Sequence, residues 1–600
     1  MDSAITPAVP PLTVETASFE QIIQAAEALG ANRGDAAVIE LYQDWIAIRG
    51  AGDRHLYAAW FNLGVELSRG GASADAIRAY RTALALNPGF GAAAVNLGLM
   101  LEQTGQTGAA LHTWVQAIQP DDARLALLNH RARLLEQLGR LDEAEATMRT
   151  SLLTRPDQPD VIQHWLHVRQ KMCLWPVLAE VVPGLTAEAM LRQCGPLAAL
   201  ALTDRVAKQT DITARWIARK TVPAPERLSP PRGYDHEHIR VGYMSSDFCR
   251  HAMGYLIAEL FERHDRARFE VFGYCLTADD GSDIRARILA GFDHVVSIRD
   301  MTDEAAARRI RADEIDILID LNGLTAGSRL QIMRWRPAPI QATYLGFIGP
   351  VPLPELDYLF CDTIVVPPEA APAYYPRPLA IAPNYQANDT RRAIGAPVSR
   401  VQAGLPDDRF VFCCFSNYYK ITEPMFDAWL EILRGAGNAV LWLVGDNPWA
   451  RDNLRARAHG SGIDPDRLIF AARVDPAEYM ARLALPDLFL DTFPYNAGTI
   501  ASDAIRMGLP LLTLRGESFA SRMASRLLEA IGAEEGIAGS LNDYVETAIR
   551  LATDAPVHAR FRAMFTPERW AATIGDIAGF TDAYEATLIR IEAALTLPPA

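Results

Sequence analysis

Residues 57–156 repeat with a period of 34, and this regularity limits them to one kind of architecture. Three segments, which begin at Tyr57, Gly91 and Leu125, align on each other without gaps. A period of this length is typical of helical pairs that stack into a solenoid. The matching residues are Leu63, Gly64, Ala76, Tyr80, Ala83 and Pro88 in the first segment, Leu97, Gly98, Ala110, Trp114 and Ala117 in the second, and Ala144, Met148, Ser151 and Pro156 in the third.

This pattern resembles the tetratricopeptide repeat, and its chemistry explains why each segment would fold as two helices. Small residues at positions 8 and 20 let the helices approach closely, and a large residue at position 24 fills the space beside the neighbouring helix. Proline at position 32 ends the second helix, because it lacks an N–H and clashes with the preceding turn. We therefore predict repeats over 19–156, with a divergent helical pair at 19–52 as a cap and a flexible segment at 1–18. An unrelated helical bundle is the alternative.

The period is lost after residue 156, and a Pro-rich break follows. Residues 157–225 keep a helical pattern, so we expect them to form a collar next to the repeats. The run from Val222 to Gly233 contains four prolines and marks a domain boundary.

From residue 239 onward, short β-rich runs alternate with helical stretches, which indicates parallel α/β sheets. We predict two doubly wound, Rossmann-like lobes at 235–390 and 405–600, the second closed by helices at 556–565 and 573–596. Two such lobes with a crevice between them are the arrangement of a GT-B glycosyltransferase. The predicted fold class is thus an all-α solenoid followed by an α/β GT-B fold. The predicted strands are 239–243, 269–275, 294–298, 315–320 and 342–346 in the first lobe, and 410–415, 439–444, 468–470, 488–490 and 511–513 in the second.

Composition excludes several classes of function. The chain carries 73 acidic and 58 basic residues, a net charge of -15, whereas a broad nucleic-acid surface needs a basic excess. Its seven cysteines contain no CxxC pair, which argues against a disulfide framework and structural zinc and favours reduced thiols. No signal peptide is visible, and no run approaches the ~20 apolar residues of a membrane span. We therefore expect a cytoplasmic protein that binds neither nucleic acid nor membrane.

Five short motifs occur in order after the Pro-rich break. They are Val241–His251 (VGYMSSDFCRH), Arg336–Gln341 (RPAPIQ), Phe415–Ile421 (FSNYYKI), Asp491–Thr499 (DTFPYNAGT) with Asp503, and Gly516–Arg522 (GESFASR). Together they resemble the O-linked N-acetylglucosamine transferase family, including its bacterial members. The resemblance covers about 235–535, and the repeats upstream complete the same architecture. The long insert between the lobes of animal members is missing, since only the short connector 389–409 lies between Asn388 and the strand that begins at Phe410.

The resemblance implies a set of donor-binding residues in the second lobe. Lys420 follows the first strand of this lobe, where a fixed ammonium would stabilise the charge that a departing UDP develops. Thr499 precedes a helix expected to begin near Ala501, whose free N–H groups would form an anion site. Asp503 would accept hydrogen bonds from the ribose hydroxyls. The implied set is Asn417, Tyr419, Lys420, Tyr479, Asn496, Gly498, Thr499 and Asp503.

Four positions depart from the family pattern. Gly498 and Ile500 stand where the better-known sequence Asn-Gly-His-Thr-Thr has histidine and the second threonine, so two polar groups are lost. Asn417 replaces a glutamine and reaches less far toward a phosphate. Tyr479 replaces a histidine that stacks on the base, which a tyrosine ring can also do. Packing within a predicted helix at 476–484 is the alternative role for Tyr479. These changes leave the donor sugar open.

The first motif supplies the candidates for activating the acceptor. His251 ends the motif, and an imidazole has a suitable pKa to take a hydroxyl proton. Asp247 is the second candidate, in which case His251 positions the acceptor or the sugar. Gly323, in the stretch 322–325 after a predicted strand, permits close approach of a ligand. No carboxylate pair stands at a credible metal site, so we expect no metal ion and no cofactor, with the UDP-sugar as a substrate.

The sequence therefore predicts an inverting glycosyltransferase. A Ser or Thr hydroxyl of a protein acceptor, held by the repeat arm, would displace UDP from a UDP-sugar, with N-acetylglucosamine as the expected sugar. Three alternatives stay open: transfer from UDP-glucose to an asparagine amide, as in related bacterial N-glycosyltransferases; a repeat scaffold with an inactive lobe; and a saccharide acceptor. The presence of His251, Lys420, Thr499 and Asp503 weighs against the scaffold. The sequence does not indicate an oligomeric state.

Overall fold

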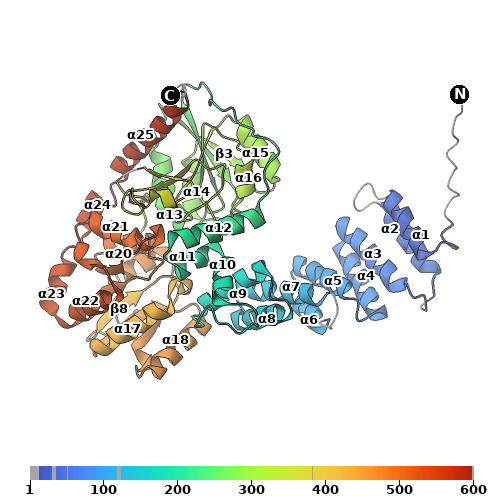
Figure 1. Ribbon diagram of the computed structural model, residues 1–600, viewed down its shortest axis with the longest axis horizontal. Helices are drawn as coiled ribbons and strands as arrows, with labels where there is room; N and C mark the ends of the chain where they lie inside the picture. The colour runs from blue at the N-terminus through green and yellow to red at the C-terminus, as the bar shows by residue number, and fades with distance from the viewer. Residues whose placement is uncertain (1–12, 30–35, 51, 118–122, 382, 597–600) are drawn as a thin grey trace. The chain divides into compact units, whose positions relative to one another are not determined.

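The protein forms two compact units (Figure 1). This computed structural model describes residues 13–29, 36–50, 52–117, 123–381 and 383–596. The first unit ends at Val168 and includes Val181–Gly184, and the second comprises Arg169–Glu180 and the chain from Leu185 onward. Residues 1–12 of the predicted flexible segment 1–18 lie outside the described residues.

The first unit is a series of helical pairs, as the period predicts. Each repeat contributes two helices that pack on each other, and each pair packs on the next. The pair α1 and α2 lies in the stretch 19–52 that the sequence predicts as a cap. The solenoid of the predicted fold class is therefore confirmed. The helices are α1 (Phe19–Leu29), α2 (Ala36–Ile48), α3 (Leu56–Arg69), α4 (Ser73–Leu86), α5 (Gly91–Gln103), α6 (Thr107–Gln116), α7 (Arg124–Gln137), α8 (Leu141–Thr154) and α9 (Pro159–Lys171), the last of which continues into the second unit.

Small residues face large ones where the two helices of a repeat cross. A Cβ atom added to Gly64 would lie 2.7 Å from the Tyr80 ring, and one added to Gly98 would overlap the Trp114 indole. Both aromatic side chains are fully buried. The small residue at position 8 and the large residue at position 24 therefore form one contact, repeated along the unit.

The turn between the two helices of each repeat also recurs with the 34-residue period. Gly71, Gly105 and Gly139 are 34 residues apart, and their φ angles lie between 71° and 80°. This left-handed conformation favours glycine, because a Cβ atom would be strained there. Each glycine N–H donates to a carbonyl oxygen in the last turn of the preceding helix. The predicted pattern does not include this position, although glycine is a common signal for such a turn.

Replacing Gly98 with alanine is expected to destabilise the first unit by about 1–3 kcal/mol, because the new methyl group overlaps Trp114 in a packed interior. Gly108→Ala, in the second helix of the same repeat, is the control, since a Cβ atom there meets no neighbour within 4 Å. Alanine's higher helix propensity should leave that variant neutral or stabilised by up to about 1 kcal/mol. Urea unfolding followed by circular dichroism measures both. Equal behaviour of the two variants would contradict the crossing contact.

The second unit contains two parallel sheets, so the GT-B arrangement of the predicted fold class is confirmed. The first lobe has seven strands in the order β3-β2-β1-β4-β5-β6-β7, and the second has six in the order β10-β9-β8-β11-β12-β13. In each lobe the strand order reverses beside the first strand, which is where ligands bind in such sheets. The strands are β1 (Ile239–Ser245), β2 (Phe269–Cys275), β3 (His294–Ser297), β4 (Ile317–Asp320), β5 (Ile340–Thr343), β6 (Tyr358–Cys361), β7 (Arg377–Ala380), β8 (Phe410–Cys414), β9 (Ala439–Val444), β10 (Leu468–Ala471), β11 (Leu488–Leu490), β12 (Leu511–Leu514) and β13 (Ile537–Ala538).

Helices cover both faces of these sheets, as a doubly wound fold requires. On the first sheet, Val241 and Tyr243 pack into one apolar core while Met244 packs into the other, because successive strand residues point to opposite faces. The helices are α10 (Ala187–Gln193), α11 (Pro196–Leu202), α12 (Val206–Lys220), α13 (Ala252–Arg263), α14 (Asp283–Ala290), α15 (Asp303–Ala312), α16 (Leu330–Arg334), α17 (Glu423–Gly435), α18 (Pro448–Gly460), α19 (Pro476–Arg482), α20 (Thr499–Arg506), α21 (Met523–Ala530), α22 (Leu541–Thr553), α23 (Ala555–Arg562), α24 (Pro567–Ala572) and α25 (Ile577–Thr596).

Several strand and helix boundaries differ from the predicted ones. The strand predicted at 342–346 is wrong beyond Thr343, because Leu345 has a φ of 71° and the chain turns there. None of β6, β7 and β13 is among the predicted strands. β7 contains Pro378, which disfavours a strand assignment, and β13 has only two residues.

The last helix packs on the first lobe, although the sequence-based division assigns 405–600 to the second. Phe580 and Tyr584 of α25 belong to the same apolar core as Val241 of β1. A buried hydrogen bond joins α25 to the first lobe, since Glu585 accepts at 2.9 Å from the imidazole of His264, which follows α13. The predicted start at residue 573 also lies four residues before the observed start at Ile577.

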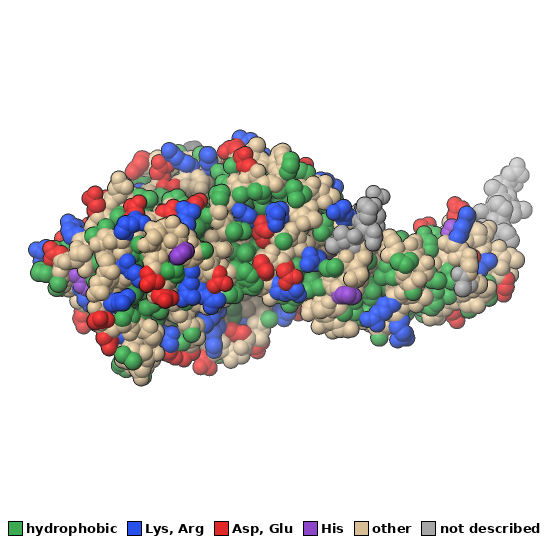
Figure 2. Space-filling view, turned by 90° about the horizontal axis from the view of Figure 1, so that it is seen from below, with side chains coloured by type: hydrophobic (Ala, Val, Ile, Leu, Met, Phe, Trp, Pro, Cys, Tyr) green, Lys and Arg blue, Asp and Glu red, His purple; other side chains and the backbone are tan. Residues whose placement is uncertain are grey.

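The surface carries charges of both signs. On the face shown in Figure 2, acidic and basic side chains are interspersed, without one large area of a single sign. Within the described ranges, no helix combines the length and the apolar character that crossing a bilayer requires.

Candidate functional site

A cavity of about 340 Å³ opens at the carboxyl ends of strands from both lobes. The loops after β1, β4 and β5 line it from one side, and the loops after β8 and β11 line it from the other. Its volume lies within the range of small-molecule sites, ~300–1,000 Å³. Seven of the residues predicted from the sequence line it: Asp247, His251, Asn417, Tyr419, Lys420, Gly498 and Thr499.

Lys420 lies on the part of the cavity wall that the second lobe forms. It ends a short 3₁₀ turn, Tyr418–Lys420, that follows β8 directly. Its ammonium Nζ donates to the carbonyl oxygen of Asn496 at 3.0 Å and lies 3.6 Å from the centre of the Tyr495 ring. Burial lowers the pKa of Lys420, while the nearby carboxylate of Asp491 favours its charged form. The cation is thus held in a partly desolvated place, where its field on a neighbouring anion is strong.

The loop after β11 is held from inside by a fully buried carboxylate. Asp491 accepts hydrogen bonds from the N–H groups of Thr492 and Ala497, both at 2.8 Å, and from the Thr513 hydroxyl at 2.7 Å. Burial raises the pKa of Asp491, and the nearby Lys420 opposes this. The structure turns the side chain of Asn496 into the loop, where it donates to the carbonyl oxygen of Thr492 at 2.8 Å. The backbone carbonyl oxygen of Asn496 therefore accepts from Lys420, while its side chain stabilises the loop.

Helix α20 begins at the cavity with an open first turn. Thr499 is its first residue, two positions before the predicted start, and Gly498 precedes it without a capping side chain. The first N–H groups of a helix have no partner within the helix and favour an anion. A Cβ atom at Gly498 would come within 3.2 Å of the Tyr385 hydroxyl and 3.4 Å of Gln386. Glycine therefore leaves room here for side chains of the stretch between β7 and β8.

Tyr385 and Gln386 are site residues that the sequence-based set does not contain. Both line the cavity and are at most 2% exposed. The Tyr385 hydroxyl has no hydrogen-bond partner in the part of the chain that the structure describes, so it is available to a ligand. Burial raises the pKa of Tyr385 well above its usual value, which keeps the hydroxyl protonated as a donor. The polar run 384–390, between two lobes of apolar strands, is the one sequence signal that points to them.

The first lobe brings His251 and Asp247 together. The imidazole Nδ1 of His251 lies 3.6 Å from the Asp247 carboxylate and 3.4 Å from the N–H of Met253. One ring nitrogen cannot donate to the first and accept from the second, so these contacts are alternatives. Asn322 fixes Asp247 by donating to its carboxylate at 2.9 Å, and burial raises the pKa of Asp247. The side chain of His251 is 52% exposed.

The loop after β4, which contains Asn322, is held in place by a buried carboxylate. Asp320, at the end of β4, accepts the N–H groups of Asn322 at 3.1 Å and Gly323 at 2.9 Å. Burial raises the pKa of Asp320 to about 7. Gly323 has a φ of 57°, and a Cβ atom there would lie 2.7 Å from Phe347. This glycine therefore serves a tight turn and close packing.

Tyr479 and Asp503 lie together around an arginine that the sequence-based set does not contain. Arg392, from the connector between the lobes, donates to the Asp503 carboxylate at 2.5 Å, and both side chains are 10% exposed. Its guanidinium lies 4.7 Å from the centre of the Tyr255 ring and 5.8 Å from that of Tyr479. The Tyr479 hydroxyl and the Arg392 Nε have no partner within the described residues. The cluster thus joins the connector to both lobes and leaves two polar atoms unsatisfied.

The described residues contain no group of three or more His, Cys, Asp or Glu side chains that could hold a metal ion. The expectation of a metal-independent reaction stays a prediction. Lys420 and the start of α20 are the positive groups that the described cavity presents to an anion.

The comparisons with known proteins agree with this architecture. The sequence profile of the family described as Glycosyl transferase family 41 matches residues 224–391 and 386–583, and a tetratricopeptide repeat profile matches 125–158. The chain is 32% identical over 415 residues to the "Probable UDP-N-acetylglucosamine--peptide N-acetylglucosaminyltransferase SEC" of Arabidopsis thaliana, a match that covers 65% of this chain and 42% of that protein. It is 28% identical over 465 residues to the UDP-N-acetylglucosamine--peptide N-acetylglucosaminyltransferase of Caenorhabditis elegans, which covers 59% and 40%.

The chain therefore spans about two fifths of the length of these curated relatives. Among solved structures, a mutant O-GlcNAc transferase of Thermobaculum terrenum superimposes with a TM-score of 0.65 at 24% identity. The superposition covers 91% of this chain and 99% of that one, and it shows a shared fold.

Proposed function

Because the chain belongs to glycosyl transferase family 41, we propose that it transfers a sugar from a UDP-sugar to a protein, with inversion at the anomeric carbon. One observation carries this proposal: the Lys420 ammonium and the open start of α20 face the same cavity. A departing diphosphate develops negative charge, and a fixed cation and a helix N-terminus both stabilise such charge.

The proposed chemistry is a single displacement. An acceptor hydroxyl oxygen attacks the anomeric carbon as the bond from that carbon to the diphosphate oxygen breaks, and UDP leaves with the electron pair. The hydroxyl proton goes to His251, or to Asp247 with His251 as the positioning group. The arrangement supports either assignment, since the two side chains lie within 3.6 Å of each other on the cavity wall.

For the donor we propose UDP-N-acetylglucosamine and for the acceptor a Ser or Thr side chain. The names of the Arabidopsis thaliana and Caenorhabditis elegans relatives, which give UDP-N-acetylglucosamine as donor and a peptide as acceptor, support this donor and a protein acceptor. The choice of Ser or Thr rests on the resemblance of the five motifs to the O-linked family. UDP-glucose with an asparagine acceptor is the second candidate, because Gly498 and Ile500 replace polar residues of the better-known donor loop. The helical repeats would supply acceptor binding, since solenoids present extended surfaces for protein segments.

The short connector 389–409 favours a place among the bacterial members of the family. The seven cysteines, all of them free, support the proposed cytoplasmic location.

The test is UDP release by the purified chain, with UDP-N-acetylglucosamine and UDP-glucose offered separately. We expect release with the first donor and at least tenfold less with the second. Because Lys420 and α20 supply the positive charge, EDTA should leave the rate unchanged. Release with UDP-glucose alone would move the proposal to the second candidate. Absence of both release and UDP binding would leave a repeat scaffold as the better account.

His251→Ala is expected to lower kcat by about 10²-fold, the lower end for a general base, because the imidazole is half-exposed and only loosely held. If His251 takes the proton, the acidic limb of the pH–rate profile should disappear in this variant. If Asp247 takes it, the limb should persist in His251→Ala and disappear in Asp247→Asn. His459→Ala, at the end of α18, is the control and should behave as the wild type. An unchanged kcat in His251→Ala would remove His251 from the mechanism.

A further inference from the structure

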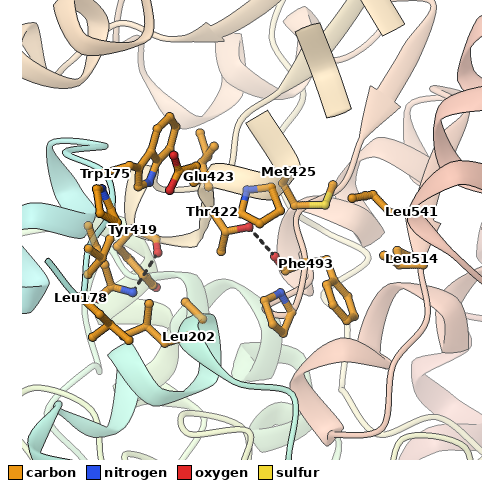
Figure 3. A pocket seen from close by; sticks show the side chains of 17 residues that line it. Trp175, Leu178, Leu202, Tyr419, Thr422, Glu423, Met425, Phe493, Leu514 and Leu541 are labelled. Atoms are coloured by element: carbon orange, nitrogen blue, oxygen red, sulfur yellow. Dashed lines mark hydrogen bonds between the residues drawn. The ribbon is translucent and has the colours of Figure 1, made fainter. Parts of the chain in front are cut away.

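A second cavity, of about 430 Å³, adjoins the donor loops within the second unit (Figure 3). The segment after α9 and the end of α11 line it from one side. The start of α17 and the Phe493–Pro494 pair line it from the other, together with Leu514 and Leu541. None of the predicted chemistry uses this space.

The walls of the second cavity are mostly apolar. Figure 3 shows Trp175 and Leu178 on one side and Leu514 and Leu541 on the opposite side, with Phe493 between them. Such a surface favours an apolar occupant, because removing about 100 Å² of apolar area from water contributes roughly 2.5 kcal/mol.

Two of the residues that line this cavity, Gln170 and Trp175, each carry a buried polar atom without a partner among the described residues. Gln170 is 3% exposed, and its Nε2 donates to the carbonyl oxygen of Tyr419 at 3.4 Å. Its Oε1 has no hydrogen-bond partner among the described residues, and neither has the indole Nε1 of Trp175. An unmade hydrogen bond of a buried group is costly, so a ligand that satisfies both atoms gains more than its apolar area alone gives. Oε1 needs a donor and Nε1 needs an acceptor.

We propose that this cavity binds a small molecule with an apolar, preferably aromatic, body and one uncharged amide group. The amide N–H would donate to Gln170 Oε1, and the amide oxygen would accept from Trp175 Nε1. A carboxylate is disfavoured in the same place, because it has no N–H to donate to Gln170 Oε1 and its charge would lose water against a largely apolar wall.

Occupation of this site would act on the donor loops, a consequence that rests on the proposed function. Tyr419 lines both cavities and immediately precedes Lys420. The Thr422 hydroxyl donates to the carbonyl oxygen of Phe493 at 3.1 Å, which ties together the two loops that hold Lys420 and Tyr495. A ligand packed against both loops would reduce their freedom, and UDP would then bind to loops that are already ordered.

The test uses 3-phenylpropanamide as the probe and 3-phenylpropanoate as its matched control, with saturation-transfer NMR on the full chain and no sugar donor present. We expect the amide to bind with a Kd of about 1 mM or below and the carboxylate at least tenfold more weakly. With the amide near saturation, the Kd of UDP should fall about fivefold, and saturating UDP should tighten the amide by the same factor. Because probe binding is measured without a sugar donor, its result does not depend on the transferase proposal.

Leu202→Trp and Leu178→Trp each fill part of the cavity from a different segment and should abolish amide binding. Circular dichroism identifies which of the two variants is folded, and the folded one is used. Leu138→Trp, at an exposed site in the first unit, should bind the amide as the wild type does. Equal binding of amide and carboxylate, binding that survives the filled cavity, or no binding to the wild type would each overturn the proposal.

Discussion

Replacing Lys420 with methionine is expected to lower kcat for UDP release by about 10²–10³-fold, the usual cost of removing one fixed group that stabilises a developing anion. Methionine keeps most of the apolar volume of the lysine stem and removes only the cation. The ammonium is held by the carbonyl oxygen of Asn496 and by the face of the Tyr495 ring, so its position needs little adjustment when the diphosphate forms. KM should change less than kcat, because the charge on the leaving group grows in the transition state.

Lys208→Met is the matched control, since the Lys208 side chain is 52% exposed and makes one long ion pair. It should keep the wild-type rate. Loss of Lys420 also removes a charge that favours ionised Asp491, so that carboxyl should keep its proton to higher pH. Thermal unfolding of both variants separates a folding defect from a lost catalytic group. A Lys420→Met enzyme that is folded and fully active would show that the diphosphate is stabilised elsewhere.

Breaking the Arg392–Asp503 pair from either side is expected to destabilise the second unit by about 3–5 kcal/mol, because the remaining charge would be buried without a partner. The double variant Arg392→Met with Asp503→Leu should be far less destabilised than the sum of the two single ones, since no buried charge is left. Arg391→Met is the control. The Arg391 side chain is 56% exposed and pairs with Glu262 at the surface, so its loss should cost about 1 kcal/mol or less.

The pH dependence of these variants follows from the same pair. Burial raises the pKa of Asp503, and Arg392 opposes this, so in Arg392→Met the pKa rises further. The folded variant then holds a proton that the unfolded chain releases near pH ~3.9. Stability relative to the wild type should therefore fall as pH rises from about 4 toward neutral. Urea unfolding at several pH values measures this, and a pH-independent difference would contradict the pairing.

Asp503→Leu should also weaken UDP binding, by about tenfold or more, if the carboxylate accepts the ribose hydroxyls, because hydrogen bonds to a charged group contribute about 1.5–3 kcal/mol. Isothermal titration with UDP measures the change. Unchanged UDP affinity in a folded Asp503→Leu variant would restrict Asp503 to the structural pair with Arg392.

Local, repeated sequence patterns are sufficient to predict much of this fold. The 34-residue period sets the helical pairs, because the contact of Gly64 with Tyr80 and of Gly98 with Trp114 lies within one repeat. Alternating strands and helices similarly require doubly wound lobes. The motifs around His251 and Lys420 follow the first strand of each lobe, and the topology of such sheets brings those positions to one crevice.

Long-range packing determines which other side chains reach this crevice and which turn away from it. Tyr385 and Arg392 lie in the stretch between β7 and β8, which has no periodicity, so no pattern marks them. The packing of the lobes nevertheless brings Tyr385 into the site and Arg392 beside it. Asn496 stands in the expected motif, but its side chain satisfies the loop's own carbonyl group. Helix α25 returns to the first lobe because its apolar face completes that core. Such contacts join residues far apart in the chain, and their energies depend on a geometry that no local pattern encodes.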